Sequence, residues 1–179
     1  MRNIILILFL VAMVVCLIGC ESKLVQAVFQ EQEWSENYAL EDGVTCTSPD
    51  MIDGSIGTVG RAPFPERIVG RTVYGAFPNA EVEITFPEKK SIHKIVIHSE
   101  KLEDFKVLAL TGPGENWDLL AEIDSNKEKM VVIKASAMTN KIKIRARGIP
   151  SSAGDGSLHS IKVAEPEIQE IEIYGYAAK

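Results

Sequence analysis

Apolar and polar residues alternate with a period of two in several short runs of this chain. In AEVEITF, residues 80–86, the apolar Val82, Ile84 and Phe86 alternate with acidic and hydroxyl residues, which is typical of a strand with one solvated face. SIHKIVIHS, residues 91–99, is apolar on nearly both faces and indicates a central strand. Further runs of strand character are DFKVLAL, KMVVIKA, NKIKIRARG and EIQEIEIYGY, which begin at residues 104, 129, 140 and 167.

These runs are separated by clusters of Gly, Pro, Asn and Asp, and no long amphipathic helix lies among them. The pattern predicts an all-β protein built as an antiparallel sandwich or barrel. Two segments, 60–80 and 148–167, are too long for hairpin turns, and loops of this length are expected to be functional or mobile.

The first twenty residues, MRNIILILFLVAMVVCLIGC, contain one basic residue followed by an unbroken apolar run. This is the layout of a secretory signal peptide. The last four residues, LIGC, resemble the lipobox of bacterial lipoproteins, in which the cysteine is acylated and becomes the new N-terminus. We therefore predict a signal peptide at 1–19, a tether at 20–34 that begins with lipidated Cys20, and one folded domain at 35–177. An uncleaved membrane anchor is the alternative.

Lipidation of Cys20 with two or more acyl chains would anchor the protein stably to a membrane. The resemblance therefore implies an extracytoplasmic protein on a bacterial membrane. In enterobacteria an Asp after the lipidated cysteine favours retention in the inner membrane, so Glu21 favours the outer membrane.

Charge and cysteine content exclude several classes of partner and site. The formal net charge of −6 becomes −7 when Arg2 leaves with the signal peptide, and an acidic chain lacks the electrostatic footprint of a nucleic-acid-binding protein. Cys16 also leaves and Cys20 is lipidated, so Cys46 stands alone. The mature chain therefore has no disulfide framework and no cysteine zinc site, and Cys46 is expected to be a buried small residue.

The histidines do not indicate a catalytic site. His93 and His98 fall in the predicted central strand, where a structural role is the commoner one. In GDGSLHS, Asp155, Ser157 and His159 are close in sequence, but alternate residues of an extended segment do not form the relay that a triad requires, and no G-x-S-x-G motif is present. We interpret this segment as a polar loop and predict that the protein is not an enzyme.

Two pairs of glutamates, Glu81 with Glu83 and Glu170 with Glu172, have a spacing of two on predicted strands, which places both members of a pair on one face. Glycoside hydrolysis requires carboxylates on opposite sides of a cleft, about 5 to 10 Å apart. The sequence shows no sign of such a cleft, and the first pair is interpreted as part of a solvated strand face.

The segment PDMIDGSIGTVGR, residues 49–61, has the glycines and aspartates of a tight loop. An EF-hand requires a bidentate glutamate at loop position 12. Counted from Asp50 or from Asp53, that position is Arg61 or Phe64, so both EF-hand registers fail.

A different calcium loop is compatible with the same segment. Asp53, Ser55 and Thr58 offer three side-chain oxygens within six residues. Calcium requires six to eight oxygens, so this loop needs a carboxylate from elsewhere in the chain. The alternative is a hydrogen-bonded turn without metal, in which Asp53 caps backbone amides.

Much of the chain, from about residue 37 to 176, resembles discoidin domains, also called F5/8 type C domains, which are related to family 32 carbohydrate-binding modules. The pair IDGxxxT near the start and EIEIYG at the end is moderately specific. The segments that carry the resemblance, in the expected order, are NYALEDGVTCTS, MIDGSIGT, AEVEITFPEKKSIHKIVIHSE, EDFKVLALTGPGENWDLLAE, NKIKIRARG and IQEIEIYGY.

The resemblance implies an eight-stranded, galactose-binding-like jelly-roll sandwich with adjacent chain ends. Many members of the family hold a structural Ca²⁺. This sequence departs from the family by having Ser55 where Asn or Asp is usual, and by lacking a T-x-W motif after the loop. Carried over to this chain, the calcium ligands are Asp53, Ser55, Thr58 and Glu170, with main-chain carbonyls near Asp50 and Gln169.

Sugar-binding members of the family use an aromatic platform on loops, with Arg, His or Asn beside it. The alternatives here are that Trp117 belongs to strand packing and that the aromatic residues of segment 60–80 close a small core of their own. The resemblance thus implies a lipid-anchored, non-catalytic module that binds a glycan or another component of the cell envelope; a structural or protein-interaction module is the alternative. The candidate ligand-binding residues are Arg61, Phe64, Arg67, Arg71, Tyr74, Phe77, Trp117 and His159.

Overall fold

A computed structural model describes residues 33–64, 79–112, 114, 116–151 and 162–177 of the chain. The chain divides into two units, Met1–Glu33 and Trp34–Lys179, and the helices and strands described here belong to the second. Within the described ranges, no helix is both long enough and apolar enough to cross a bilayer. The predicted signal peptide, Cys20 and nearly all of the tether lie outside these ranges. The elements are η1 (Tyr38–Leu40), β1 (Thr45–Cys46), η2 (Pro49–Met51), β2 (Gly60–Arg61), β3 (Asn79–His98), β4 (Phe105–Leu110), β5 (Trp117–Ile123), β6 (Met130–Arg147), β7 (Ile149–Ser151), β8 (Lys162–Ala164), β9 (Glu167–Ile168) and β10 (Glu170–Tyr174).

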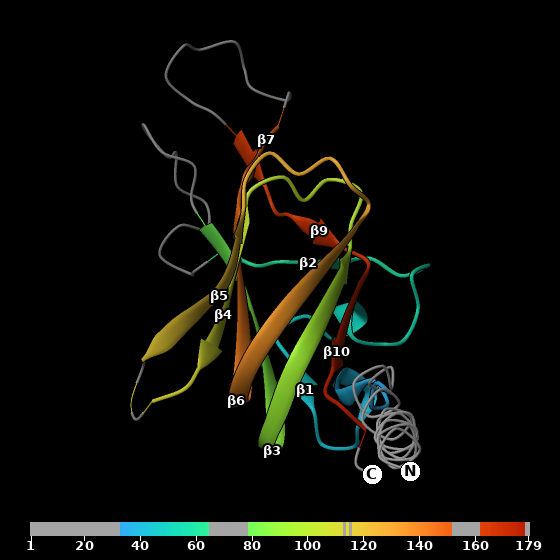
Figure 1. The fold of residues 1–179 in the computed structure, drawn as a ribbon. Helices are drawn as coiled ribbons and strands as arrows, with labels where there is room; N and C mark the ends of the chain where they lie inside the picture. The colour runs from blue at the N-terminus through green and yellow to red at the C-terminus, as the bar shows by residue number, and fades with distance from the viewer. Residues whose placement is uncertain (1–32, 65–78, 113, 115, 152–161, 178–179) are drawn as a thin grey trace, which may run out of the picture. The chain divides into compact units, whose positions relative to one another are not determined.

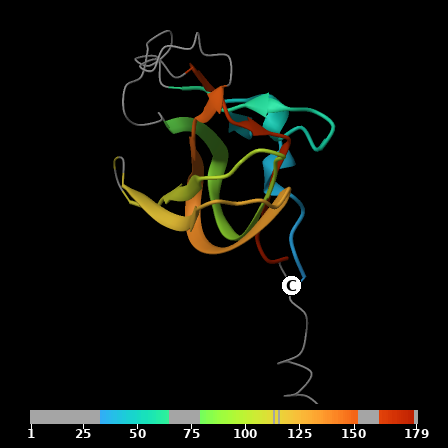
Figure 2. The same cartoon turned by 90° about the horizontal axis from the view of Figure 1, so that it is seen from above.

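Two long antiparallel strands, β3 and β6, form the frame of the main sheet, whose order is β1-β3-β6-β4-β5 with β10 also paired to β3 (Figure 1). Both strands bend, and the view from above shows them curving around the interior (Figure 2). The arm of β3 before the bend pairs with β1, whereas the arm after it pairs with β10. The two arms therefore belong to two layers of an antiparallel β-sandwich, which confirms the predicted fold class.

Each long strand replaces two strands that the sequence pattern predicted separately. AEVEITF and SIHKIVIHS are both part of β3, and KMVVIKA and NKIKIRARG are both part of β6. The pairing register of β3 with β6 shifts between Thr85 and Lys90 and again between Ile92 and Lys94. Pro87 has no amide hydrogen and falls in the first of these interruptions, where no ladder hydrogen bond is lost. The polar segment PEKK, residues 87–90, which separates the two predicted runs, is thus a bend within β3 and not a hairpin turn.

The core lies between the two layers. It is formed by the hydrophobic side chains, mostly aliphatic, on the inward face of each strand. Val82, Ile84 and Phe86 are buried, as the period of two predicted. Ile171 and Ile173 of β10 are also buried, and they alternate with Glu170, Glu172 and Tyr174.

The two ends of the domain meet, as the family resemblance implied. Trp34 forms an isolated antiparallel bridge with Tyr176, and the Ser35 amide donates to the Gly175 carbonyl at 3.1 Å. The Asn37 side chain caps η1 and joins it to the last strand, because its Oδ1 accepts from the amides of Ala39 at 3.1 Å and Ile173 at 2.9 Å.

Candidate metal centre and binding pocket

The Asp53 loop, residues 49–61, is attached to the core through the short helix η2 at its start. Pro49 begins η2, and Met51 at its end is fully buried. Gly54 has φ +80°, a conformation that a side chain disfavours, and this reverses the chain directly after Asp53. The Ser55 amide then donates to Asp53 Oδ1 at 2.9 Å, so Asp53 closes the turn.

Oxygen atoms gather around the hydroxyl of Thr58. Its Oγ1 lies 2.7 Å from Asp53 Oδ2, 2.9 Å from the Ser55 carbonyl oxygen and 3.5 Å from the Asp50 carbonyl oxygen. A hydroxyl has one hydrogen, so it satisfies one of these three acceptors at a time. The structure thus brings together Asp50, Asp53, Ser55 and Thr58 as the resemblance implied, and leaves more acceptors than donors.

Glu170 joins this loop from β10. Its Oε2 accepts from the Gly54 amide at 3.1 Å, while its Oε1 is buried and has no hydrogen-bond partner. The residue is 2% exposed. Burial raises the pKa of the Glu170 carboxyl, the hydrogen bond from the Gly54 amide lowers it and the nearby charge of Asp53 raises it, with a net pKa of about 7. A buried carboxylate with one unpaired oxygen is costly unless a cation compensates it.

The chemistry of these donors fits calcium, which prefers carboxylate and carbonyl oxygens. Two of the expected ligands, Ser55 and Gln169, also make hydrogen bonds within the protein. The hydroxyl of Ser55 accepts from the Gly57 amide at 3.2 Å, so its carbonyl is the oxygen beside Thr58. The Gln169 side chain donates to the Ile56 carbonyl at 3.2 Å and ties the loop to the last strand. Among the described residues, no group of three or more His, Cys, Asp or Glu side chains could hold a metal, so such a site would depend on backbone oxygens.

The other candidate residues within the described ranges are dispersed. Arg61 is exposed on β2 and pairs with Glu167 at 3.4 Å. Phe64 is partly buried and packs against the core. Trp117 begins β5, and the Lys143 ammonium lies 4.4 Å from the centroid of its ring. Arg67, Arg71, Tyr74, Phe77 and His159 lie outside the described residues.

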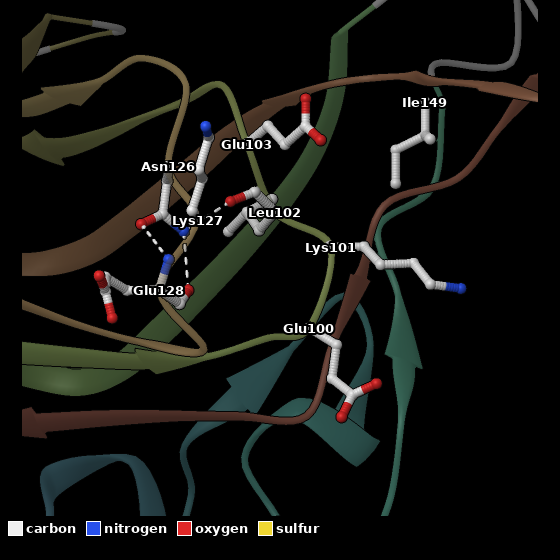
Figure 3. A pocket seen from close by; sticks show the side chains of 8 residues that line it. All are labelled: Glu100, Lys101, Leu102, Glu103, Asn126, Lys127, Glu128 and Ile149. Carbon is white, nitrogen blue, oxygen red and sulfur yellow. Dashed lines mark hydrogen bonds between the residues drawn. The ribbon is translucent and has the colours of Figure 1, made fainter.

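A pocket of about 250 Å³ lies between the loops that join β3 to β4 and β5 to β6 (Figure 3). Asn126 fixes the second loop against the first, because its Nδ2 donates to the carbonyl oxygens of Leu102 and Glu128, each at 2.9 Å. The sequence pattern did not predict this pocket, because its two loops, SEKLED at 99–104 and DSNKEK at 124–129, have the composition of ordinary polar turns. The lining residues are Glu100, Lys101, Leu102, Glu103, Asn126, Lys127, Glu128 and Ile149.

A charge ladder lies on the outer face of the first layer, the one that contains β3 before its bend and β6 after its bend. Lys143 Nζ lies 3.2 Å from Glu81 and 3.0 Å from Glu83, Arg145 pairs with Glu81 at 2.8 Å, and Lys141 pairs with Glu83 at 3.4 Å. Burial raises the pKa of Glu83, but the hydrogen bond and charge of Lys143 outweigh burial, so this pKa is lowered overall. The face is self-neutralised.

The outer face of the second layer carries a smaller polar chain. His98 Nε2 lies 2.9 Å from Glu172 Oε1, and the Tyr174 hydroxyl donates to Glu172 Oε2 at 2.6 Å. Both oxygens of Glu172 therefore have partners, unlike those of Glu170 on the same strand.

No protein-family model matches the chain, and no curated protein matches it in sequence. Solved structures do match it. The module CpGH89CBM32-6 of Clostridium perfringens aligns with a TM-score of 0.54 at 15% identity, covering 78% of this chain and 98% of that one. The fold is that of family 32 carbohydrate-binding modules.

Two more such modules were solved with sugars. The family 32 module of C. perfringens NanJ, in complex with galactose, has a TM-score of 0.52 at 15% identity and covers 79% of this chain and 99% of its own. Chitosan-binding module 2 of a Paenibacillus sp. IK-5 chitosanase/glucanase, in complex with chitotriose, has a TM-score of 0.51 at 17% identity and covers 78% and 100%. At these identities the likeness establishes the family 32 fold, which confirms the predicted galactose-binding-like sandwich.

Proposed function

We propose that this protein is a non-catalytic, extracytoplasmic binding module for carbohydrate, anchored to a bacterial membrane through lipidated Cys20. The observation that carries the binding role is the match over nearly the whole length of modules solved with galactose and with chitotriose. A match of this kind transfers the architecture, and the site has to be argued from this chain's own residues.

The pocket between the β3–β4 and β5–β6 loops is the part of the described structure best suited to a sugar. Its amide, carboxylate and ammonium groups are donors and acceptors for hydroxyls, and Leu102 and Ile149 give it an apolar side. Among its described lining residues there is no aromatic ring. Of the aromatic candidates from the sequence, Tyr74 and Phe77 lie outside the described residues, and their part in stacking stays a prediction.

We further propose that the Asp53 loop and Glu170 hold a structural Ca²⁺. The unpaired Oε1 of Glu170 and the surplus of acceptors around Thr58 support this assignment. The ion would neutralise two carboxylates and join the loop to β10. Its role would be stability and not sugar chemistry, because the pocket is lined by other residues.

Sugar binding is tested by isothermal titration calorimetry of the chain from residue 21 onward with galactose, N-acetylglucosamine and chitotriose. All core residues lie after residue 34, so this chain retains the whole core. Lys101→Ala and Lys127→Ala should weaken binding, because both lysines line the pocket. The control is Lys106→Ala, which should leave binding unchanged because Lys106 lies on β4 and pairs with Glu122 of β5. If no sugar binds saturably and a protein partner does, the module is a protein-interaction domain.

The anchor is tested separately in cells. Wild-type protein should fractionate with membranes, and mass spectrometry should find acyl chains on Cys20. The Cys20→Ser variant should lose both properties. Retention of the variant in the membrane with an intact N-terminus would instead identify an uncleaved anchor.

A further inference from the structure

An aromatic stack lies where the two ends of the domain meet. The ring of Tyr176 stacks on Trp34, with centroids 5.3 Å apart, and on His93, with centroids 4.1 Å apart. Trp34 and Tyr176 are each 43% exposed. Neither belongs to the buried core, so their stack is a surface feature built from the first and last described segments of the chain.

A cation is held beside this stack. Lys94 Nζ lies 4.4 Å from the centroid of the Trp34 ring and 4.0 Å from that of Tyr174. We call Trp34, His93, Lys94 and Tyr176 the aromatic end. It combines partly exposed indole and phenol rings with an ammonium group, the side chains that are enriched where an apolar phase meets water.

The aromatic end and the pocket lie at opposite ends of one strand arm. His93 lies beside the bend of β3, whereas the pocket residues begin at Glu100, just after β3 ends. Seven residues of extended chain span about 23 Å. In Figure 1 the bends of β3 and β6 lie at the bottom, and β7 lies at the top.

We propose that the aromatic end rests on the headgroup region of the membrane to which Cys20 is attached. This inference rests on the proposed anchor. Cys20 precedes Trp34 by fourteen residues, so the tether spans at most about 50 Å and keeps this end of the domain near the bilayer. The rings enter the interface, Lys94 meets lipid phosphates, and the sugar pocket points away from the membrane.

The test uses the mature chain, residues 20–179, with Cys46→Ala, coupled through Cys20 to a maleimide-bearing lipid in phosphatidylcholine vesicles. The chain has two tryptophans, so W117F leaves Trp34 as the single reporter. Vesicles with brominated acyl chains should quench Trp34 emission relative to unbrominated vesicles. Because coupling is chemical, the result does not depend on lipidation in cells, which the fractionation experiment tests.

The matched control places the reporter at the other end of the same arm. Met130 pairs with His98 and is 53% exposed, so W34F/W117F/M130W reports on the pocket end. Loss of quenching in this variant, with quenching of Trp34, supports the proposal. Equal quenching at both positions, or none at Trp34, overturns it. A dimer of uncoupled protein that W34A disrupts in sedimentation would also overturn it, because the stack would then be a subunit interface.

Discussion

The pair Glu81 and Glu83 on β3 and the pair Glu170 and Glu172 on β10 have the same spacing in the sequence and different surroundings in the structure. The first pair faces lysine and arginine on the neighbouring strand, so its charges are neutralised and the pKa of Glu83 is lowered. In the second pair, His98 and Tyr174 satisfy Glu172, whereas the loop above buries Glu170 and leaves one oxygen unpaired.

The difference shows that the spacing of two determines which face of the strand a glutamate pair occupies. The residues packed against that face determine whether the carboxylates are neutralised. Each residue of the first pair lies opposite a basic residue of β6 in the register, Glu81 opposite Arg145 and Glu83 opposite Lys143. Glu170 lies opposite His98, but the Asp53 loop covers it and brings another carboxylate close. One pair is therefore part of a self-neutralised ladder, and the other includes the buried carboxylate for which we propose a bound cation.

The largest effect on stability is expected from truncating Met51, the buried side chain that packs the Asp53 loop against the core. Met51→Ala empties a fully buried position below the loop and should lower the free energy of unfolding by about 2 to 5 kcal/mol. Urea denaturation measures the change. The matched control is Met138→Ala, since Met138 is exposed and its truncation should cost little. Equal losses in both variants would show that the loop is not seated through Met51.

Calcium should separate the two glutamate pairs. Calcium at about 100 times its Kd should raise the free energy of unfolding of chelator-treated protein by about 2.7 kcal/mol. Glu170→Gln should remove this response, and Glu172→Gln, two residues away, should retain it. Thermal unfolding with and without chelator measures both. An unchanged melting temperature in the wild-type protein would favour the metal-free turn.

Without calcium, the pH dependence of stability should carry the signature of Glu170. Its pKa is raised from 4.5 to about 7 in the folded state, so between these values the native state binds more protons than the unfolded state. The free energy of unfolding should therefore fall as the pH rises from about 4.5 to about 7. Glu170→Gln should flatten this decline in denaturation curves recorded with chelator. A slope that survives the substitution would have to come from another group.

Much of the fold was predictable because it follows from local patterns. The alternation in residues 80–86 correctly assigned the buried positions, and the structure brings Glu170 to the loop at Asp53, as the family resemblance implied. The continuity of β3 was not predictable in this way, because Pro87 and the polar residues after it have the composition of a turn. The pairing of β3 with β6 on both sides of that segment, up to Thr85 and again from Lys90, is what makes the two halves one strand.

The pocket and the aromatic end were missed for a related reason. Asn126 acts through backbone carbonyls of another loop, and Trp34 stacks on a residue 142 positions later in the sequence. Such contacts depend on tertiary structure and leave no periodic signal. Trp34 is the last residue of the predicted tether, and only the tertiary structure shows its bridge to Tyr176.

The smallest effect is expected in the charge ladder. Lys143→Met removes the central cation, which is buried, but Glu81 and Glu83 are partly exposed and each keeps a basic partner, Arg145 or Lys141. The loss should therefore be about 1 kcal/mol. Because the pKa of Glu83 is lowered from 4.5, its stabilisation is present above pH 4.5 and is lost as the pH falls through the folded-state pKa. The variant should therefore lose less stability on acidification than the wild type. Lys106→Met, which breaks a more exposed pair with Glu122, should leave the acid limb unchanged. A loss of several kcal/mol in K143M would mean that the first glutamate pair depends on a single cation, as we propose for Glu170.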